Sequence, residues 1–424
     1  MLERQYFVIL HTMKRALHIL LATVLILLTC CCNPHETEKQ KHLFLVYIAA
    51  TDQVIHNFAQ GNVTDMLEGY VPAKQSSDDV LLVFYQGIDY NTATKRADAT
   101  LTRYYKNNSG NMVSEIVASF DSDFNACDPA SFAEVLEIAE DYCSPTYRSL
   151  LFSSHGTAWL PIGYFSSPTD KSFSLSQMRK GPEDSGISSL SKLNSIESIG
   201  RDKPTGDELD IIDFARVTGK YHWNVMLLDC CLMSAVEVAY ELRDCCDWIM
   251  ASPTEILAYG FVYNNITEKV FKSPNEAGYR FLCQQYYDYY QSGTGSLQSG
   301  TIALIKCSEL DALSDICAEI AATRRSQMES VERMKVQHYF YNSHYDYNFD
   351  LADYFRQFAT EDQYNRFCTQ LERAVPYKAT TNEFLGLKIE HYSGLSCYIP
   401  DSRYVNLNDY YKQLAWNQKV VVVE

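Results

Sequence analysis

Five apolar runs recur between residues 43 and 252, and polar segments with helical spacing separate them. Each run has five to eight residues with few polar interruptions, which is the length of a strand. Continuous apolar character, without alternation, is typical of strands buried on both faces of a parallel sheet. The pattern therefore predicts an α/β fold, a layered α/β/α sandwich around a mostly parallel sheet. The five runs are 43–50 (LFLVYIAA), 80–85 (VLLVFY), 148–153 (RSLLFS), 224–228 (NVMLL) and 248–252 (WIMAS).

The pattern changes twice along the chain. Residues 161–202 are rich in Ser, Gly, Lys and Asp, which predicts a long exposed loop. After about residue 276 the spacing is mostly helical and the chain is rich in Tyr, with strand-like pieces at 301–305 and 395–399. We therefore expect a core domain at 43–275 and a largely helical C-terminal region at 276–424 that packs on it.

The amino terminus has the features of an export signal. Lys14 and Arg15 precede an apolar run at 16–28, which is too short to span a bilayer comfortably and ends at three cysteines. This pattern resembles a bacterial lipoprotein signal, with 1–31 as the signal segment, Cys31 as the lipid-bearing residue and 32–42 as a tether. An uncleaved membrane anchor is the alternative. We expect an exported bacterial lipoprotein of the cell envelope, on its periplasmic or surface face.

Charge and cysteine content narrow the classes of function. The formal net charge of −17 argues against a nucleic-acid-binding protein, because phosphate would be repelled, and it is compatible with cationic peptides. Eleven of the 14 cysteines follow residue 32, and none forms a pair with zinc-like spacing. No phosphate-binding glycine motif follows a predicted strand, and no calcium loop is present in the sequence. We expect no cofactor, no metal and no disulfide framework.

Two predicted strands carry polar residues at their carboxyl ends. The third run leads into His155-Gly156, and the fourth leads into Cys230-Cys231 and a helix predicted at 232–243. Parallel strands deliver such residues to the same edge of the sheet. A His beside a Cys favours the thiolate, and a thiol at the first turn of a helix has its pKa lowered further. The alternative is a buried Cys that packs the core and a His-Gly turn.

A resemblance to a known family is carried by 227–242 (LLDCCLMSAVEVAYEL). This segment is very similar to the nucleophile segment of the clostripain-like cysteine peptidases, which reads D-A-C-L-M followed by V-E-V-A-Y-E-L. Cys230 stands where the family has Ala, and strand alternation would point it away from His155, so Cys231 is the expected nucleophile. Further matches span about residues 43 to 400, at 48–52, 199–202, 252–255 with Gly260 and Tyr263, 349–353 and 393–396.

The resemblance implies a caspase-type fold and a cysteine endopeptidase with a Cys–His dyad. The Cys231 thiolate would attack the scissile carbonyl, and the backbone N–H groups of Gly156 and Cys231 would hold the oxyanion. His155 would protonate the leaving amine, and water would release the acyl group. The substrates would be proteins or peptides, and we expect the enzyme to be a monomer.

The family commonly cleaves after Arg or Lys, which implies an acidic S1 pocket. Asp229 matches the family position for a carboxylate that would pair with a cationic P1 side chain. Asp52, after the first strand, and Glu255, after the fifth, could also line this pocket. A helix cap for Asp52 and a solvated charge for Glu255 are their alternative interpretations.

The loop at 161–202 offers basic residues at which the enzyme could cut itself, as family members often do. Arg179 and Lys180 are the preferred candidates, and a plain surface loop is the alternative. A second hypothesis for the whole chain is a catalytically silent lipoprotein that binds peptides or glycans on the same fold. Retention of both His155 and Cys231 argues against that hypothesis.

Overall fold

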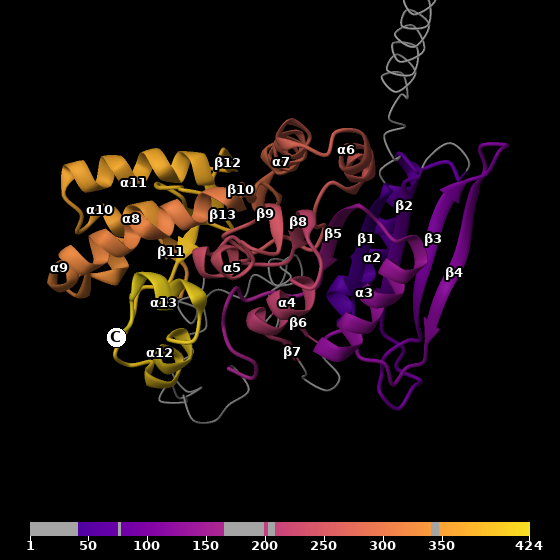
Figure 1. The fold of residues 1–424 in the computed structure, drawn as a ribbon, viewed down its shortest axis with the longest axis horizontal. Coiled ribbons are helices and arrows are strands. Elements are labelled where there is room, and N and C mark those ends of the chain that lie inside the picture. The colour runs from indigo at the N-terminus through magenta and orange to yellow at the C-terminus, as the bar shows by residue number, and fades with distance from the viewer. Residues whose placement is uncertain (1–40, 75–77, 165–198, 202–207, 341–346) are drawn as a thin grey trace, which may run out of the picture. The chain divides into compact units, whose positions relative to one another are not determined.

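A computed structural model of the protein describes residues 41–74, 78–164, 199–201, 208–340 and 347–424. Lys41–Glu424 forms one compact unit. Its centre is a nine-stranded sheet with the order β12-β10-β9-β8-β5-β1-β2-β3-β4 (Figure 1). Helices cover both faces of this sheet, so the predicted α/β/α sandwich is confirmed.

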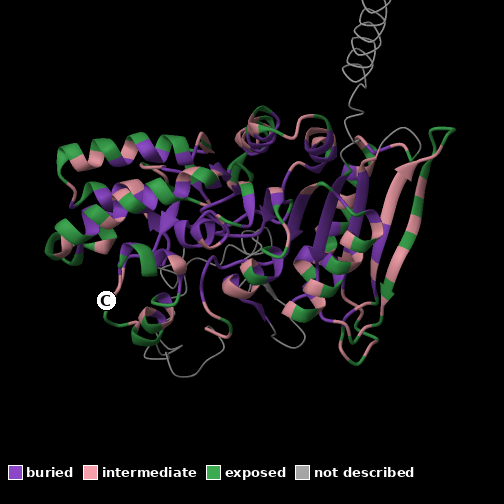
Figure 2. Ribbon diagram, in the orientation of Figure 1, coloured by how far each residue is buried: buried purple, intermediate pink, exposed green. Residues whose placement is uncertain are grey.

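Five neighbouring parallel strands form the middle of the sheet, and they coincide with the five apolar runs. Burial on both faces explains why these runs lack alternation. Figure 2 shows β1 buried along its whole length, whereas edge strand β4 alternates between exposed and half-buried residues. The five strands are β9 (Cys246–Ala251), β8 (Trp223–Asp229), β5 (Tyr147–Ser153), β1 (His42–Ala49) and β2 (Val80–Gln86).

Antiparallel strands extend the sheet on both sides. At one side β3 (Ala99–Lys106) pairs with β2, and β4 (Met112–Phe120) forms the edge. At the other side β10 (Thr301–Lys306) pairs with β9, and β12 (Tyr377–Thr380) pairs with β10. The strand-like piece expected at 301–305 is thus part of the central sheet, and the C-terminal region contributes two strands to it.

Two hydrophobic clusters lie on opposite faces of the sheet. One contains side chains of α2 (Gln53–Glu68), α6 (Ile266–Lys272) and α7 (Glu276–Gln291). The other contains side chains of α3 (Pro129–Cys143), α4 (Ile211–Thr218), α5 (Val236–Glu241) and the C-terminal helices. The C-terminal helices are α8 (Leu310–Thr323), α9 (Arg325–Glu329), α10 (Leu351–Arg356), α11 (Glu361–Ala374), α12 (Val405–Tyr411) and α13 (Ala415–Val420).

Short strand pairs and turns complete the described chain. The strand pairs are β6 (Ile199–Arg201) with β7 (Glu208–Leu209), β11 (Phe349–Asp350) with β15 (Ser396–Cys397), and β13 (Glu383–Phe384) with β14 (Leu387–Lys388). The 3-10 turns are Tyr263–Asn265, Gly295–Leu297, Cys307–Glu309 and Arg333–Lys335.

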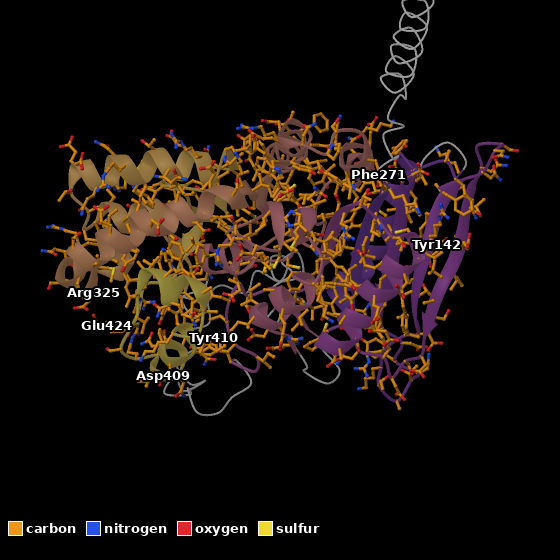
Figure 3. All side chains as sticks on the ribbon, viewed as in Figure 1. Tyr142, Phe271, Arg325, Asp409, Tyr410 and Glu424 are labelled. Atoms are coloured by element: carbon orange, nitrogen blue, oxygen red, sulfur yellow. The ribbon has the colours of Figure 1, made fainter. Side chains whose placement is uncertain are left out.

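Aromatic packing and polar links fix the C-terminal region on the core. Tyr410 of α12 donates a hydrogen bond to Asp210, the N-cap of α4, at 2.6 Å. Within the C-terminal region itself, Arg325 forms an ion pair with Glu424 at 3.5 Å, and both are labelled in Figure 3. The sticks in Figure 3 fill the space between the sheet and the helices on each side. A densely packed interior of this kind holds the loops at the sheet edge in fixed positions.

Candidate active site

The residues expected to carry chemistry leave the sheet at one edge. In the parallel register Ile48 of β1 pairs with Ser153 of β5, and Ser153 pairs with Asp229 of β8. The residues that follow these three positions therefore emerge next to one another. They lie at the carboxyl ends of the strands, where open α/β sheets place their ligands.

His155 is buried beside Asp52. The imidazole Nε2 lies 3.7 Å from Asp52 Oδ1, and both side chains are at least 97% buried. The same Oδ1 accepts hydrogen bonds from the N–H groups of Val54, at 2.7 Å, and Ile55, at 3.4 Å. Asp52 is thus the N-cap of α2 and a carboxylate facing His155, so the cap interpretation and a role in the site are compatible.

Cys231 is buried and lies against the segment that follows β9. The backbone N–H of Ile256 donates to its Sγ at 3.3 Å, and the Ile256 carbonyl oxygen is 3.8 Å from Sγ. The sulfur thus meets a backbone donor and a backbone acceptor of the same residue, and these two groups fix its position. No residue pattern indicates this contact, since backbone groups of any residue type can make it.

The helix expected from residue 232 begins later, at Val236, so that prediction was wrong. Leu232 has a φ of +66°, which ends any helical continuation from the strand. Its N–H donates to Thr254 O at 2.9 Å, and the Ser234 N–H donates to Ser252 O at 3.0 Å. Pairing with the segment after β9 therefore replaces the first helical turn, and Cys231 does not lie in the first turn of α5.

Gly156 brings the two strand-end loops into contact. A Cβ at this position would lie 2.7 Å from Cys231 O and 2.9 Å from Cys230 Cβ, so a side chain would force the loops apart. The Cys230 thiol lies 3.6 Å from Phe152 O, whereas Cys231 faces Ile256. The two adjacent thiols, which follow the last residue of β8, thus have different surroundings.

Asp229 is fully buried and hydrogen-bonded. Tyr263 donates to its Oδ2 at 2.6 Å, and Ser153 donates to the same oxygen at 3.2 Å. Burial, and then the charge of Asp229, hold the pKa of Tyr263 well above its ordinary value, which keeps the phenol a donor. Gly260, with a φ of +71°, closes the site: a Cβ there would lie 2.6 Å from Oδ2. Tyr290 donates to Gly260 O at 2.7 Å and holds this turn.

The remaining predicted residues have different outcomes. Glu255 is buried, 3% exposed, so it is not a solvated charge, and it precedes the residue that contacts Cys231. Arg179, Lys180 and Cys31 lie outside the described residues. The functional neighbours that sequence reasoning did not identify are Ile256 and Ser153. Only the sheet register, which pairs Ser153 with Asp229, indicates the second of these.

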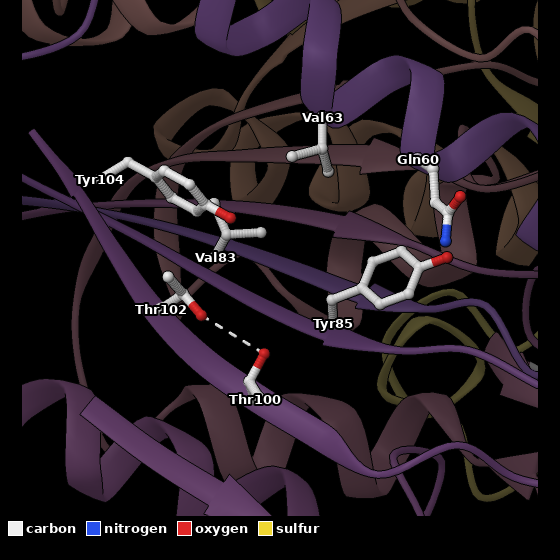
Figure 4. A pocket seen from close by; sticks show the side chains of 7 residues that line it. All are labelled: Gln60, Val63, Val83, Tyr85, Thr100, Thr102 and Tyr104. Atoms are coloured by element: carbon white, nitrogen blue, oxygen red, sulfur yellow. Dashed lines mark hydrogen bonds between the residues drawn. The ribbon is translucent and has the colours of Figure 1, made fainter. Parts of the chain in front are cut away.

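Other features of the described chain are separate from this edge. A pocket of about 230 Å³ lies between α2 and strands β2 and β3, and none of the predicted site residues lines it (Figure 4). In the part of the chain that the structure describes, no cluster of three His, Cys, Asp or Glu side chains could hold a metal ion. No helix within those residues is long and apolar enough to cross a membrane.

Comparison with known proteins gives one family. The sequence model of the clostripain family, peptidase family C11, matches residues 46–173 and 186–421. Together these segments cover most of the chain. No curated protein matches the chain closely enough to be informative.

Similar solved structures span nearly the whole described chain. An inactive zymogen of a C11 protease from Parabacteroides distasonis has 26% identity and a TM-score of 0.71, with 90% of this chain and 98% of that chain covered. A secreted C11 cysteine protease from Bacteroides thetaiotaomicron, iotapain, has 23% identity and a TM-score of 0.70, with 90% and 99% covered. A structure of a secreted C11 protease from the same organism with an irreversible peptide inhibitor has 22% identity and a TM-score of 0.68, with 90% and 98% covered.

Proposed function

The chain belongs to the clostripain family, and from this membership we propose that it is a cysteine endopeptidase that cleaves after Arg or Lys. Cysteine peptidase activity follows from the family; the dyad and the P1 preference are our proposal. The observation that carries it is the arrival of His155 and Cys231 at one sheet edge, with their loops touching at Gly156.

The proposed reaction uses the chain's own groups in sequence. The Cys231 thiolate attacks the carbonyl carbon of the scissile bond, and the N–H groups of Gly156 and Cys231 stabilise the oxyanion that forms. His155, supported by the carboxylate of Asp52 at 3.7 Å, protonates the leaving amine. Water then attacks the thioester and regenerates the thiol.

Asp229 is the proposed group that recognises a basic P1 side chain. Its Oδ2 is occupied by Tyr263 and Ser153, which orient the carboxylate without neutralising it. A guanidinium or ammonium group reaching this buried carboxylate would gain a charge-assisted hydrogen bond. Glu255 and Asp52, both buried at the same edge, would add negative charge to the pocket.

We propose further that the described conformation is a latent form of the enzyme. Cys231 has no exposed surface and His155 is 2% exposed, so a peptide must gain access before the reaction can begin. The P. distasonis protein of 26% identity is an inactive zymogen. Cleavage within 161–202, at Arg179 or Lys180, is the proposed activating step. A variant in which both residues are Gln should stay uncleaved on gels and inactive in peptidase assays.

The proposed location is the cell envelope. A lipid on Cys31 would anchor the catalytic unit through the tether at 32–42, as a monomer that meets protein substrates outside the cytoplasm. Labelled palmitate should enter the wild-type protein and not Cys31→Ser. Labelling that persists in that variant would contradict the assignment.

The deciding experiment uses the soluble fragment that starts at Asn33. Wild type, Cys231→Ala and the matched control Cys230→Ala are assayed with fluorogenic peptides that carry Arg, Lys, Asp or Ala at P1. We expect hydrolysis after Arg and Lys by wild type and Cys230→Ala, and none by Cys231→Ala. Activity lost in Cys230→Ala and kept in Cys231→Ala would overturn the choice of nucleophile.

A catalytically silent binding protein is the alternative function, and the buried state of Cys231 is the observation that favours it. It predicts no turnover by any variant, even after the loop has been cut by an added protease. Peptide binding measured by calorimetry would then persist equally in wild type and Cys231→Ala.

A further inference from the structure

A buried cluster behind the active site joins both catalytic loops to the C-terminal region. We call it the junction cluster, and it consists of Trp159, Glu237, Tyr398 and Tyr411. Trp159 follows His155 by four residues, and Glu237 follows Cys231 by six. Tyr398 and Tyr411 belong to the C-terminal region. All four residues are fully buried, each at 0% exposed.

Aromatic contacts attach the His155 loop to this cluster. The ring centroid of Trp159 lies 5.0 Å from that of Tyr398 and 4.8 Å from that of Tyr411. The two tyrosine rings are 5.1 Å apart. Such edge-to-face and tilted pairs contribute beyond the area they bury. The C-terminal region therefore supports the loop that carries His155.

Hydrogen bonds attach the Cys231 loop to the same cluster. The Glu237 Oε1 atom accepts from the Tyr411 hydroxyl at 2.6 Å and from the Tyr398 N–H at 2.8 Å. Two residues before α5, Ser234 donates through its hydroxyl to Gly394 O at 2.6 Å, and its carbonyl accepts from the Ser396 N–H at 2.9 Å. The segment that follows the nucleophile is thus fixed to the C-terminal region over several residues.

The protonation state of Glu237 is set by its surroundings. Its Oε1 has two donors, whereas Oε2 is buried and has no hydrogen-bond partner among the described residues. Two titratable groups face it, Tyr411 of α12 and Cys397 of β15. Burial is the largest cause that raises the pKa of both groups, and the charge of Glu237 is the second. Tyr354 of α10 also raises the pKa of Tyr411 electrostatically, and Asp350 does the same for Cys397. Among the described residues, no Lys or Arg lowers the pKa of Glu237.

We propose that Glu237 is a positioning residue, whose neutral form holds the C-terminal region against both catalytic loops and whose ionisation loosens that attachment. The proton resides on Oε2, because Oε1 is the atom that accepts both hydrogen bonds. Loss of this proton leaves a charge in a buried site without a cation, so the contacts around it weaken. The inference rests on the proposed peptidase function for its effect on catalysis, and on the junction cluster alone for its effect on stability.

The direction of the pH dependence follows from the raised pKa. Burial raises the pKa of Glu237 to about 7, from 4.5, against the lowering effect of its hydrogen bonds from Tyr411 and Tyr398. Between these two pH values the folded protein binds a proton that the unfolded chain has lost. The contribution of Glu237 to stability is therefore full below pH 4.5, declines as pH rises and is lost above pH 7.

Glu237→Gln tests the proposal, because Gln keeps the acceptor oxygen and cannot ionise. Glu134→Gln is the control, because it removes a carboxylate that is exposed on α3 and does not belong to the cluster. The thermal midpoint of the soluble fragment from Asn33 is measured from pH 5 to pH 8.5. We expect Glu237→Gln to gain several degrees over wild type at the alkaline end and little at pH 5, and Glu134→Gln to follow wild type.

Three further readouts separate positioning from simple stabilisation. Hydrogen exchange of peptides covering 157–160 and 231–237 should accelerate with pH in wild type beyond the intrinsic rate, and not in Glu237→Gln. The alkaline limb of kcat/KM should move up by about one pH unit in Glu237→Gln. Tyr411→Phe, which removes a bond that lowers the pKa, should shift the wild-type transition to higher pH without abolishing it.

Either of two outcomes overturns the proposal. One is a pH dependence of unfolding and exchange that is the same in Glu237→Gln as in wild type. The other is a changed unfolding profile with no change in loop exchange, which would make Glu237 a stabilising group only. Absence of turnover in every protein would count against the proposed function, while unfolding and exchange would still decide the role of Glu237.

Discussion

At the scale of single residues, the site depends on buried carboxylates whose partners fix their orientation. Asp229 shows this most clearly, since Tyr263 and Ser153 both donate to its Oδ2. In the proposed function, a cationic substrate group would add a charge-assisted hydrogen bond to this carboxylate. The proposal therefore expects basic P1 side chains to be favoured over neutral ones.

Asp229→Asn should therefore lower kcat/KM for Arg substrates by roughly 100-fold, because a hydrogen bond to a charged group contributes about 1.5–3 kcal/mol. Hydrolysis of an Ala substrate should change much less. Asp247→Asn, at an exposed carboxylate that contacts His222 at 3.0 Å, is the control and should leave both rates unchanged. Equal losses for Arg and Ala substrates would exclude Asp229 as the P1 selector.

Asp52 caps α2 and faces His155 at 3.7 Å, and in the proposed mechanism it supports the imidazole. Asp52→Asn should preserve the cap and lower kcat by about tenfold, since it removes the charge beside the imidazole. Asp52→Ala should also lower the free energy of unfolding by about 1 kcal/mol. Assays and urea unfolding of both variants separate the two effects, and full activity in Asp52→Asn would remove Asp52 from the mechanism.

At the scale of elements, the loop that follows β5 contacts the loop that follows β8, and this contact determines how the two loops lie relative to each other. Gly156→Ala should lower kcat/KM by about 100-fold or more, because a displacement near 1 Å at a reacting centre has that effect. The new Cβ would lie 2.7 Å from Cys231 O, which must move away. Kinetics and the unfolding midpoint of the purified variant measure the two consequences.

Gly61→Ala provides the comparison within α2. A Cβ at Gly61 meets no atom within 4 Å, so the substitution should raise the free energy of unfolding by roughly 0.5–1 kcal/mol through better helix propensity. Its activity should equal that of wild type. If Gly156→Ala behaved like Gly61→Ala, close contact between the two loops would not be needed for catalysis.

At the scale of the whole molecule, the C-terminal region is part of the sheet as well as a helical layer. β10 pairs with β9 and β12 pairs with β10, so the boundary expected near residue 275 passes between neighbouring strands of one sheet. The junction cluster adds a second attachment behind the active site. Lys41–Glu424 therefore forms a single compact unit.

A fragment ending at residue 275 should fail to fold cooperatively. It would leave the edge of β9 unpaired and expose apolar surface of β9 and α5 that the C-terminal region buries. Loss of near-ultraviolet circular dichroism and of a sharp thermal transition, against the intact fragment from Asn33, would show this. A cooperative transition in the short fragment would mean that 43–275 is an independent domain.

The sequence by itself determined the layered fold and the chemical types at the sheet edge. Continuous apolar runs are a local property of strands buried on both faces, so β1, β2, β5, β8 and β9 were all predictable. The polar residues that follow these strands were predictable as well, because the end of each apolar run marks the end of its strand. The nucleophile motif identified the family from local residues as well.

Tertiary structure alone decided the contacts that complete the site. The Ile256 N–H on Cys231, the Tyr263 hydroxyl on Asp229 and the Tyr411 hydroxyl on Glu237 join residues 25, 34 and 174 positions apart. The start of α5 at Val236 was decided in the same way, because pairing with the segment after β9 outweighs local helix propensity. Local pattern reports which residues are buried, whereas long-range packing decides which buried groups meet.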